Sequence, residues 1–204
     1  MISIRVGFSA LFAASVFTVI PILITGGIHM DGYLDTCDAM SSWREKARRL
    51  EILKDSNAGA FAVIYGSVYF LLYLGAASAI ETPLCVGLMG MVFFISRSMS
   101  AFSVVSFPHA NPDGTAAKFG DEAQAKLVRA VTIAYVLLAY TLAICLSPAA
   151  GIGLAVVSLL TFLFYYRFCM KYSGGMTGDL AGFFTCICEL ACLLEILIVM
   201  KVLG

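Results

Sequence analysis

The sequence predicts an all-α, polytopic transmembrane bundle of about six spans, and two observations carry this prediction. The first is composition: of 204 residues, 61% are hydrophobic and 13% are charged, whereas soluble proteins use about 45–50% apolar and about 25% charged residues. The second is the length of several uncharged runs, which reach the roughly 20 residues that a helix needs to cross a bilayer. Residues 1–204 are therefore expected to form a single integral membrane domain.

The expected spans are 6–28, 58–80, 83–107, 130–147, 150–166 and 180–200. The first and second contain no charged residue, and the fourth and fifth come from one uncharged run that proline and glycine residues divide. The third contains Arg97, and the sixth contains Glu189 and Glu195, so these side chains should face protein or water. The first run is longer than the apolar core of a secretory signal, and no clear cleavage site follows it.

Basic residues are concentrated on one side of this topology. Ten lie in the connections after the first, third and fifth spans, and two lie on the other side. The ten are Arg44, Lys46, Arg48, Arg49, Lys54, Lys118, Lys126, Arg129, Arg167 and Lys171, and the two are Arg5 and Lys201. The positive-inside rule places the three basic connections in the cytoplasm, as in a multi-pass protein of the inner membrane.

The same three connections carry nearly all polar groups capable of chemistry. This favours an enzyme working at the cytoplasmic face, because a transporter needs access from both sides and typically shows broken helices or repeats at the midplane. Nucleic acid is not an expected partner, since 13 basic and 13 acidic residues leave no net positive charge.

Three acidic residues follow the first span at helical spacing. If the segment is a helix, Asp31, Asp35 and Asp38 lie within an arc of about 60°. Three like charges on one face repel one another, so a cation is expected among them, and carboxylate oxygens favour Mg²⁺ or Mn²⁺. The alternative is an ordinary solvated acidic face. His29, just before the acids, is either a general base or an interfacial hydrogen-bonding group.

A second polar group lies further along the first connection. Glu51 and Asp55 are separated by one helical turn, with Lys54 between them. Asp55 could supply a further metal ligand and Lys54 a cation for phosphate. A solvated helix next to the membrane explains these residues equally well.

A glycine-rich loop, Ser-Gly-Gly-Met-Thr-Gly-Asp over 173–179, precedes the last span. Its glycines would let backbone N–H groups point toward one position, and the helix that follows directs its positive end there, which is a common way of holding phosphate. Asp179 either caps that helix or binds metal.

A few polar or reactive side chains lie within the spans. Arg97 needs a partner, either Glu189 or a substrate phosphate. Most cysteines lie in or beside apolar spans, so a secreted disulfide framework is not expected. Cys186, Cys188 and Cys192 do not share one helix face and have no nearby His, so they are expected to act as small buried hydrophobic residues.

Three sequence blocks occur in order between Gly26 and Glu189. They are Gly-Gly-Ile-His-Met-Asp-Gly-Tyr-Leu-Asp-Thr-Cys-Asp from Gly26, Arg-Leu-Glu-Ile-Leu-Lys-Asp-Ser from Arg49, and Gly-Gly-Met-Thr-Gly-Asp from Gly174. Together they closely resemble the cobalamin synthase family, the adenosylcobinamide-GDP ribazoletransferases. The chain departs from the family pattern at Ala39, Asn57 and Cys186, and it begins closer to the first block than family members typically do.

The resemblance implies a Mg²⁺-dependent membrane transferase of cobalamin biosynthesis. Such an enzyme joins adenosylcobinamide-GDP to α-ribazole or its 5′-phosphate and releases GMP, with lipid and these small molecules as partners and a homo-oligomer left open. The expected metal ligands are Asp31, Asp35, Asp38 and Asp55; the expected catalytic residues are His29, Asp35 and Lys54; and the expected substrate-binding residues are Arg97, Gly174, Gly175, Thr177, Gly178 and Asp179. Metal ions would relieve charge crowding on phosphorus during attack by a hydroxyl.

Two other functions stay open. Another Mg²⁺-dependent membrane phosphotransferase, of the CDP-alcohol type, would also use spaced acids, but Asp31-Gly32 is followed by Tyr33-Leu34-Asp35 and not by the Ala-Arg of that motif. An ion-coupled transporter would explain the charged residues inside the spans.

Overall fold

The computed structural model describes residues 9–41, 58–80, 82–111 and 122–203, and nearly all of them are helical. The helices are α2 (Ala10–Thr25), α3 (Ile28–Ser41), α5 (Ala60–Ser78), α6 (Pro83–Ser106), α7 (Glu122–Leu146), α8 (Pro148–Tyr172) and α9 (Gly178–Leu203). Five of them, α5 to α9, are long and apolar enough to cross a membrane, and α2 with α3 would give a sixth span if the bent pair is one span. The predicted all-α, multi-pass class is confirmed.

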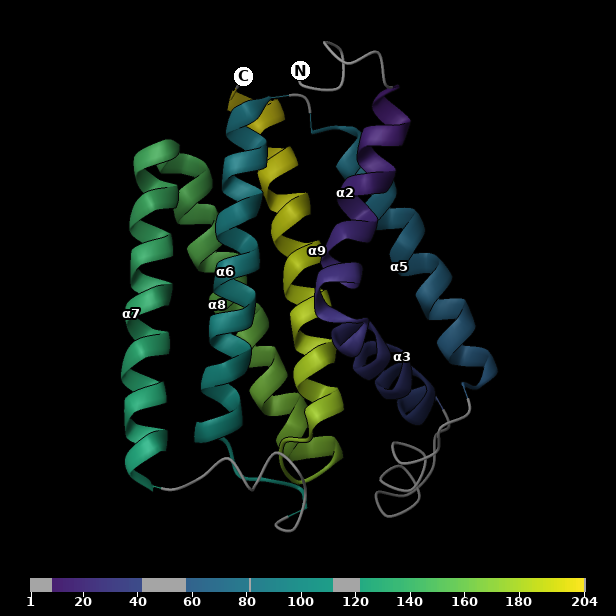
Figure 1. The fold of residues 1–204 in the computed structure, drawn as a ribbon, viewed down its shortest axis with the longest axis vertical. Helices are drawn as coiled ribbons and strands as arrows, with labels where there is room; N and C mark the ends of the chain where they lie inside the picture. Colours follow the sequence, from purple (N-terminus) through teal and green to yellow (C-terminus); the bar gives the residue numbers. More distant parts are fainter. Residues whose placement is uncertain (1–8, 42–57, 81, 112–121, 204) are drawn as a thin grey trace.

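The helices surround α9, which contacts α3, α5, α6 and α8. Figure 1 shows α6, α7, α8 and α9 as an up-and-down group, with α2, α3 and α5 along one side of it. The start of α2 and the end of α9 lie at one end of the bundle. The end of α6, the start of α7 and the turn between α8 and α9 lie at the other end, which α3 approaches (Figure 1).

Several helix ends follow from local sequence. Thr82 caps α6 by accepting a hydrogen bond from the Cys85 N–H at 3.3 Å, and Pro83 occupies the first turn, where its missing N–H costs nothing. Pro148 likewise begins α8. The predicted spans 130–147 and 150–166 were too short, because α7 begins at Glu122 and α8 continues to Tyr172. Lys126 and Arg129 therefore lie near the start of α7, and Arg167 and Lys171 lie near the end of α8, whereas the sequence analysis placed all four in loops.

A sharp bend separates α2 from α3, and the predicted first span, 6–28, does not continue through it. Gly26 and Gly27 have φ angles of 63° and 81°, in the left-handed region that glycine adopts without strain. The Gly27 N–H donates to the Ile22 carbonyl at 2.9 Å, and the Gly27 carbonyl accepts from the Asp31 N–H at 2.9 Å. One helix therefore ends where the next begins, at 95° to it.

The backbones of α3 and α9 touch at two glycines. A Cβ atom on Gly32 would lie 2.7 Å from the Asp179 carbonyl oxygen, and one on Gly182 would lie 2.8 Å from the His29 carbonyl oxygen. Only glycine permits this approach, which is how small residues let membrane helices pack closely. The contact holds the first turns of α3 against the first turns of α9.

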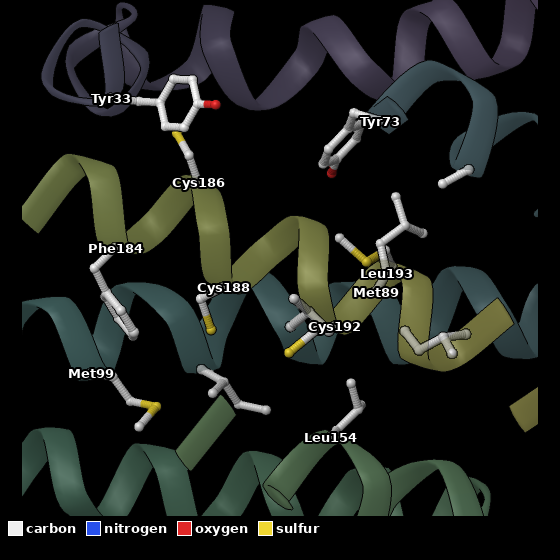
Figure 2. Close-up of a cluster of buried hydrophobic side chains, with 14 of the residues drawn as sticks. Tyr33, Tyr73, Met89, Met99, Leu154, Phe184, Cys186, Cys188, Cys192 and Leu193 are labelled. Carbon is white, nitrogen blue, oxygen red and sulfur yellow. The ribbon is translucent and has the colours of Figure 1, made fainter. Parts of the chain in front are cut away.

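The interior of the bundle is apolar and rich in sulfur. Figure 2 shows Cys188, Cys192 and Leu193 of α9 with Met99 of α6 and Leu154 of α8. All seven cysteines are free, and all but Cys145 are buried. The predicted burial of Cys186, Cys188 and Cys192 is confirmed.

Glu195 faces protein, as predicted for a carboxyl group inside a span. Its side chain packs against Gly153 of α8, and a Cβ atom on Gly153 would overlap the Glu195 carboxyl group. Both carboxyl oxygens are buried and have no hydrogen-bond partner among the described residues.

Replacing Gly32 with alanine should force α3 away from α9, because the added methyl group overlaps the Asp179 backbone. We expect Gly32→Ala to lower the free energy of unfolding by about 1–3 kcal/mol, as overpacking usually does. Unfolding in detergent micelles would measure this. The matched control is Gly90→Ala in α6, where nothing lies within 4 Å of an added Cβ atom, so stability should hold or rise slightly. An equal loss of unfolding free energy in Gly32→Ala and Gly90→Ala would contradict the contact between α3 and α9.

Candidate functional site

The acidic residues predicted to share a helix face lie on α3 (Ile28–Ser41). Their charges act on one another and on Asp179 at the start of α9. Burial, and after it the negative charges of Asp31, Asp179 and Asp38, together raise the pKa of Asp35 to about 6. The backbone contact between Gly32 and Asp179 places the start of α9 beside the first turns of α3.

The three acids of α3 differ in their surroundings. Asp31 is exposed and Asp35 is half-buried. The Asp38 carboxylate lies against Gly59, where a Cβ atom would overlap it. Gly59 is the N-cap of α5 and has no side chain to cap the helix. The Asp38 carboxylate therefore lies beside the positive end of α5, where a negative charge is favoured.

The chemistry of this donor set fits Mg²⁺, since the four carboxylates offer only hard oxygen ligands. Within residues 9–41, 58–80, 82–111 and 122–203, no group of three His, Cys, Asp or Glu side chains lies close enough to hold a metal by itself. Mg²⁺ is commonly held by one or two carboxylates with waters and substrate phosphates, so a complete protein cage is not required. Lys54 and Asp55 lie outside the described residues.

The glycine loop uses several of its N–H groups within the protein. The N–H groups of Gly174 and Gly175 donate to the Cys169 carbonyl at 3.0 and 3.2 Å and so end α8. The Met176 N–H donates to the Pro108 carbonyl at 2.7 Å, and the Met176 carbonyl accepts from the Ala110 N–H at 3.0 Å. Phosphate binding by Gly174 and Gly175 stays a prediction, and their N–H groups already have protein acceptors.

The part of the loop that remains available is the start of α9. The Thr177 hydroxyl accepts a hydrogen bond from the Leu180 N–H at 3.2 Å, so Thr177 caps this helix. Gly178 is exposed, with nothing within 4 Å of the position of a Cβ atom. The positive end of α9 therefore opens beside the first turns of α3, with Asp179 in its own first turn.

Arg97 of α6 is paired inside the bundle with Glu189 of α9, one of the two predicted partners. The two side chains form an ion pair through Arg97 Nη1 and Glu189 Oε1. Ser96 Oγ donates to the same carboxylate oxygen at 3.0 Å, and Arg97 Nη1 also donates to the Phe93 carbonyl at 3.2 Å. The carboxylate compensates the guanidinium charge, as a charged pair within a membrane requires.

His29 lies in the first turn of α3, between the carboxylates and this ion pair. Burial lowers the pKa of its imidazole, and the Arg97 charge lowers it further. His29 is therefore neutral at pH 7 and able to accept a proton. Nδ1 is buried and has no hydrogen-bond partner among the described residues.

Tyr69 and Tyr73 of α5 were missed by the sequence analysis. Both are almost fully buried, and they lie with His29, Arg97 and Glu189 around one pocket. The available signal was the spacing of Tyr65, Tyr69 and Tyr73, which places three phenols on one face of an otherwise apolar span.

Glu189→Gln should destabilise the protein, because it leaves Arg97 without a counter-charge. Breaking a fully buried pair costs about 3–5 kcal/mol. The Arg97 side chain is 32% exposed, so we expect about 2 kcal/mol, measured by unfolding in detergent. The double variant Arg97→Met/Glu189→Gln should recover part of the loss. Glu195→Gln is the control: it changes a carboxyl group without a cation partner, and no loss is expected.

The comparisons with known proteins agree with this architecture. The family model described as cobalamin-5-phosphate synthase matches residues 1–198. A protein of Lachnoclostridium phytofermentans named adenosylcobinamide-GDP ribazoletransferase is 42% identical over 185 residues, which cover 91% of this chain and 70% of that protein. A protein of the same name from Bradyrhizobium diazoefficiens is 34% identical over 195 residues, covering 95% of this chain and 73% of that one.

No solved structure matches the chain significantly. The match of the family model extends over nearly the whole sequence and includes every described residue of the acidic cluster and of the α8–α9 turn. The chain therefore belongs to the cobalamin-5-phosphate synthase family.

Proposed function

We propose that this protein transfers the cobinamide phosphate of adenosylcobinamide-GDP to α-ribazole or its 5′-phosphate, releasing GMP, in the last steps of cobalamin biosynthesis. The observation that carries the proposal is the close contact of α3, which bears Asp31 and Asp35, with the open N-terminus of α9, which bears Asp179. This arrangement would offer carboxylates for a cation and a helix N-terminus for an anion, and a pyrophosphate substrate needs both.

The residues divide between these two tasks. Asp31, which is exposed, and Asp35 would hold Mg²⁺, with Asp38 and Asp55 as further ligands. Mg²⁺ would neutralise charge on the pyrophosphate oxygens. Thr177 and Gly178 at the positive end of α9, together with Lys54, would hold a phosphate, while Asp179 stands between phosphate and cation. Arg97 contributes less here, because Glu189 already balances its charge.

The reaction needs a group that takes the proton of the attacking ribazole hydroxyl. His29 has the required state, since burial and Arg97 lower its pKa and keep the imidazole neutral. It lies two residues before Asp31 on α3, and its side chain lines the pocket with Arg97 and Glu189, whereas Asp31 is exposed.

The active site is proposed to face the cytoplasm. Figure 1 shows that the end of α8 and the start of α7 lie at the end of the bundle that α3 approaches. These ends carry Lys126, Arg129, Arg167 and Lys171. Basic residues of this kind are enriched on the cytoplasmic side, which supports placement in the cytoplasmic membrane with the substrates entering from the cytosol.

The direct test is product formation by the purified protein in lipid. With adenosylcobinamide-GDP, α-ribazole and Mg²⁺, we expect GMP and a cobalamin product in equal amounts, and with EDTA we expect neither. Chromatography of the corrinoid and of the nucleotide measures both. Folded protein that forms no product with either ribazole form would refute the proposal, and solute flux in sealed vesicles would then test the transporter.

Removing one central acid should stop the reaction. We expect Asp35→Ala to reduce turnover by more than about tenfold, since metal-bound charge stabilisation contributes several kcal/mol to such transfers, while the protein remains folded. Glu195→Gln, which alters a carboxyl group on α9 away from the site, should keep its turnover. More than about a tenth of wild-type turnover in Asp35→Ala would remove Asp35 from the metal site.

A further inference from the structure

Helix α7 carries none of the residues assigned to the candidate site, but one of its side chains holds a neighbouring helix end. The helix packs against α6 and α8 at the side of the bundle (Figure 1). Its half-buried Arg129 donates from Nε to the Val105 carbonyl at 3.1 Å and to Ser106 Oγ at 3.2 Å, and Nη2 donates to the same carbonyl. The hydrogen bonds of Arg129 to described residues therefore all go to the end of α6.

This contact completes the C-terminus of α6. The Val105 carbonyl is one of the last four of the helix, which have no N–H partner within it. A guanidinium group suits this place, because it donates from more than one nitrogen and brings positive charge to the negative end of the helix. Phe107, the next residue after α6, contacts three rings of α8 with centroid distances of 5.3, 5.4 and 4.9 Å, namely Phe162, Tyr165 and Tyr166.

The chain that leaves α6 pairs directly with the turn between α8 and α9. Pro108 accepts the Met176 N–H at 2.7 Å, and Ala110 donates to the Met176 carbonyl at 3.0 Å, so His109 and Met176 form a parallel bridge. The two backbones are so close that a Cβ atom on Gly175 would lie 2.4 Å from the Ala110 nitrogen. Met176, which is 1% exposed, is followed by Thr177, the residue that caps α9.

Hydrogen bonds therefore connect α7 to the start of α9 through one short segment, residues 105–110. We propose that Arg129 is a positioning residue for the N-terminus of α9. By fixing the end of α6, it fixes the segment that pairs with Met176, and so the direction in which the first N–H groups of α9 point. The inference deepens the proposed function and rests on it for the anion, a phosphate of the pyrophosphate substrate, that this helix end would hold.

The first test measures the turn itself and needs no substrate. In Arg129→Gln, protein in lipid nanodiscs should exchange the amide hydrogens of residues 173–181 at least about tenfold faster, because the segment that protects the Met176 N–H is less firmly held. Hydrogen-exchange mass spectrometry measures this. Arg129→Lys keeps the charge and one donor, and should restore part of the protection. The control is Arg167→Gln, which removes an equal charge from an exposed position near the end of α8 and should exchange like the wild type.

The second test asks whether the position of the turn matters for an anion. The probe is inorganic pyrophosphate with Mg²⁺, in equilibrium dialysis against the same nanodiscs. We expect Arg129→Gln to raise its Kd by about five- to tenfold, and Arg167→Gln to leave it unchanged. In turnover, the KM for adenosylcobinamide-GDP should rise in Arg129→Gln, while kcat and the KM for α-ribazole stay near their wild-type values, since Arg129 touches neither reacting group.

A double variant tests the path between the two helices. Gly175→Ala should push the turn away from residues 108–110, because the added methyl group overlaps their backbone. If Arg129 acts through this segment, Arg129→Gln should weaken pyrophosphate binding much less in the Gly175→Ala protein than in the wild type.

Four outcomes would overturn the inference. They are unchanged exchange of residues 173–181 in Arg129→Gln, faster exchange with an unchanged Kd for pyrophosphate, equal effects of Arg129→Gln and Arg167→Gln, and fully additive effects of Arg129→Gln and Gly175→Ala. Product formation with an unchanged KM in Arg129→Gln would leave the proposed function standing and remove the positioning role. Faster exchange and weaker pyrophosphate binding in that variant, in a protein that forms no product, would do the reverse.

Discussion

The close contact between α3 and α9 is the constraint on which the rest of the site depends. Its two glycines, Gly32 and Gly182, let the helix backbones meet, and the polar side chains that could take part in catalysis lie next to them in the sequence. Asp31 and Asp35 lie on α3, and Asp179 lies on α9. A cation bound beside Asp35 would relieve the repulsion that Asp31, Asp179 and Asp38 exert on it. The packing of the two helices thus sets the positions of Asp31, Asp35 and Asp179.

The apolar surroundings decide how the remaining polar groups behave. Inside the bundle, Arg97 and Glu189 form a neutral pair, while Glu195 packs against Gly153 and has no hydrogen-bond partner in the part of the chain that the structure describes. Charge is concentrated instead at the end of the bundle, where water is available and where α7 and α8 extend beyond their apolar stretches. A membrane protein can in this way keep most of its charge at one end of the bundle, while the charged residues deeper inside are paired or packed against protein.

Much of this arrangement was predictable from the sequence, because it follows from periodicity and from hydrophobic length. The helical face of Asp31, Asp35 and Asp38, the need of Arg97 for a partner and the burial of Cys186, Cys188 and Cys192 follow from local rules. Which of its two predicted partners Arg97 contacts was left open by the sequence, and the structure shows Glu189. Other features depend on contacts between distant segments. No local pattern shows that Pro108 would accept the Met176 N–H, that Asp38 would lie against Gly59, or that Tyr73 would share a pocket with His29.

The position of Asp38 couples two parts of the molecule that are distant along the chain. Its carboxylate lies at the start of α5, so the N-terminal end of that helix and any cation near α3 compete for the same negative charge. Linkage would make such competition reciprocal: a cation that draws the Asp38 carboxylate away from α5 would weaken the anchoring of that helix, and whatever tightens α5 would lower the affinity for the cation. Tyr69 and Tyr73 lie on α5 and line the pocket that also contains His29. One carboxylate and one helix would thus connect the acidic residues of α3 to the wall of this pocket.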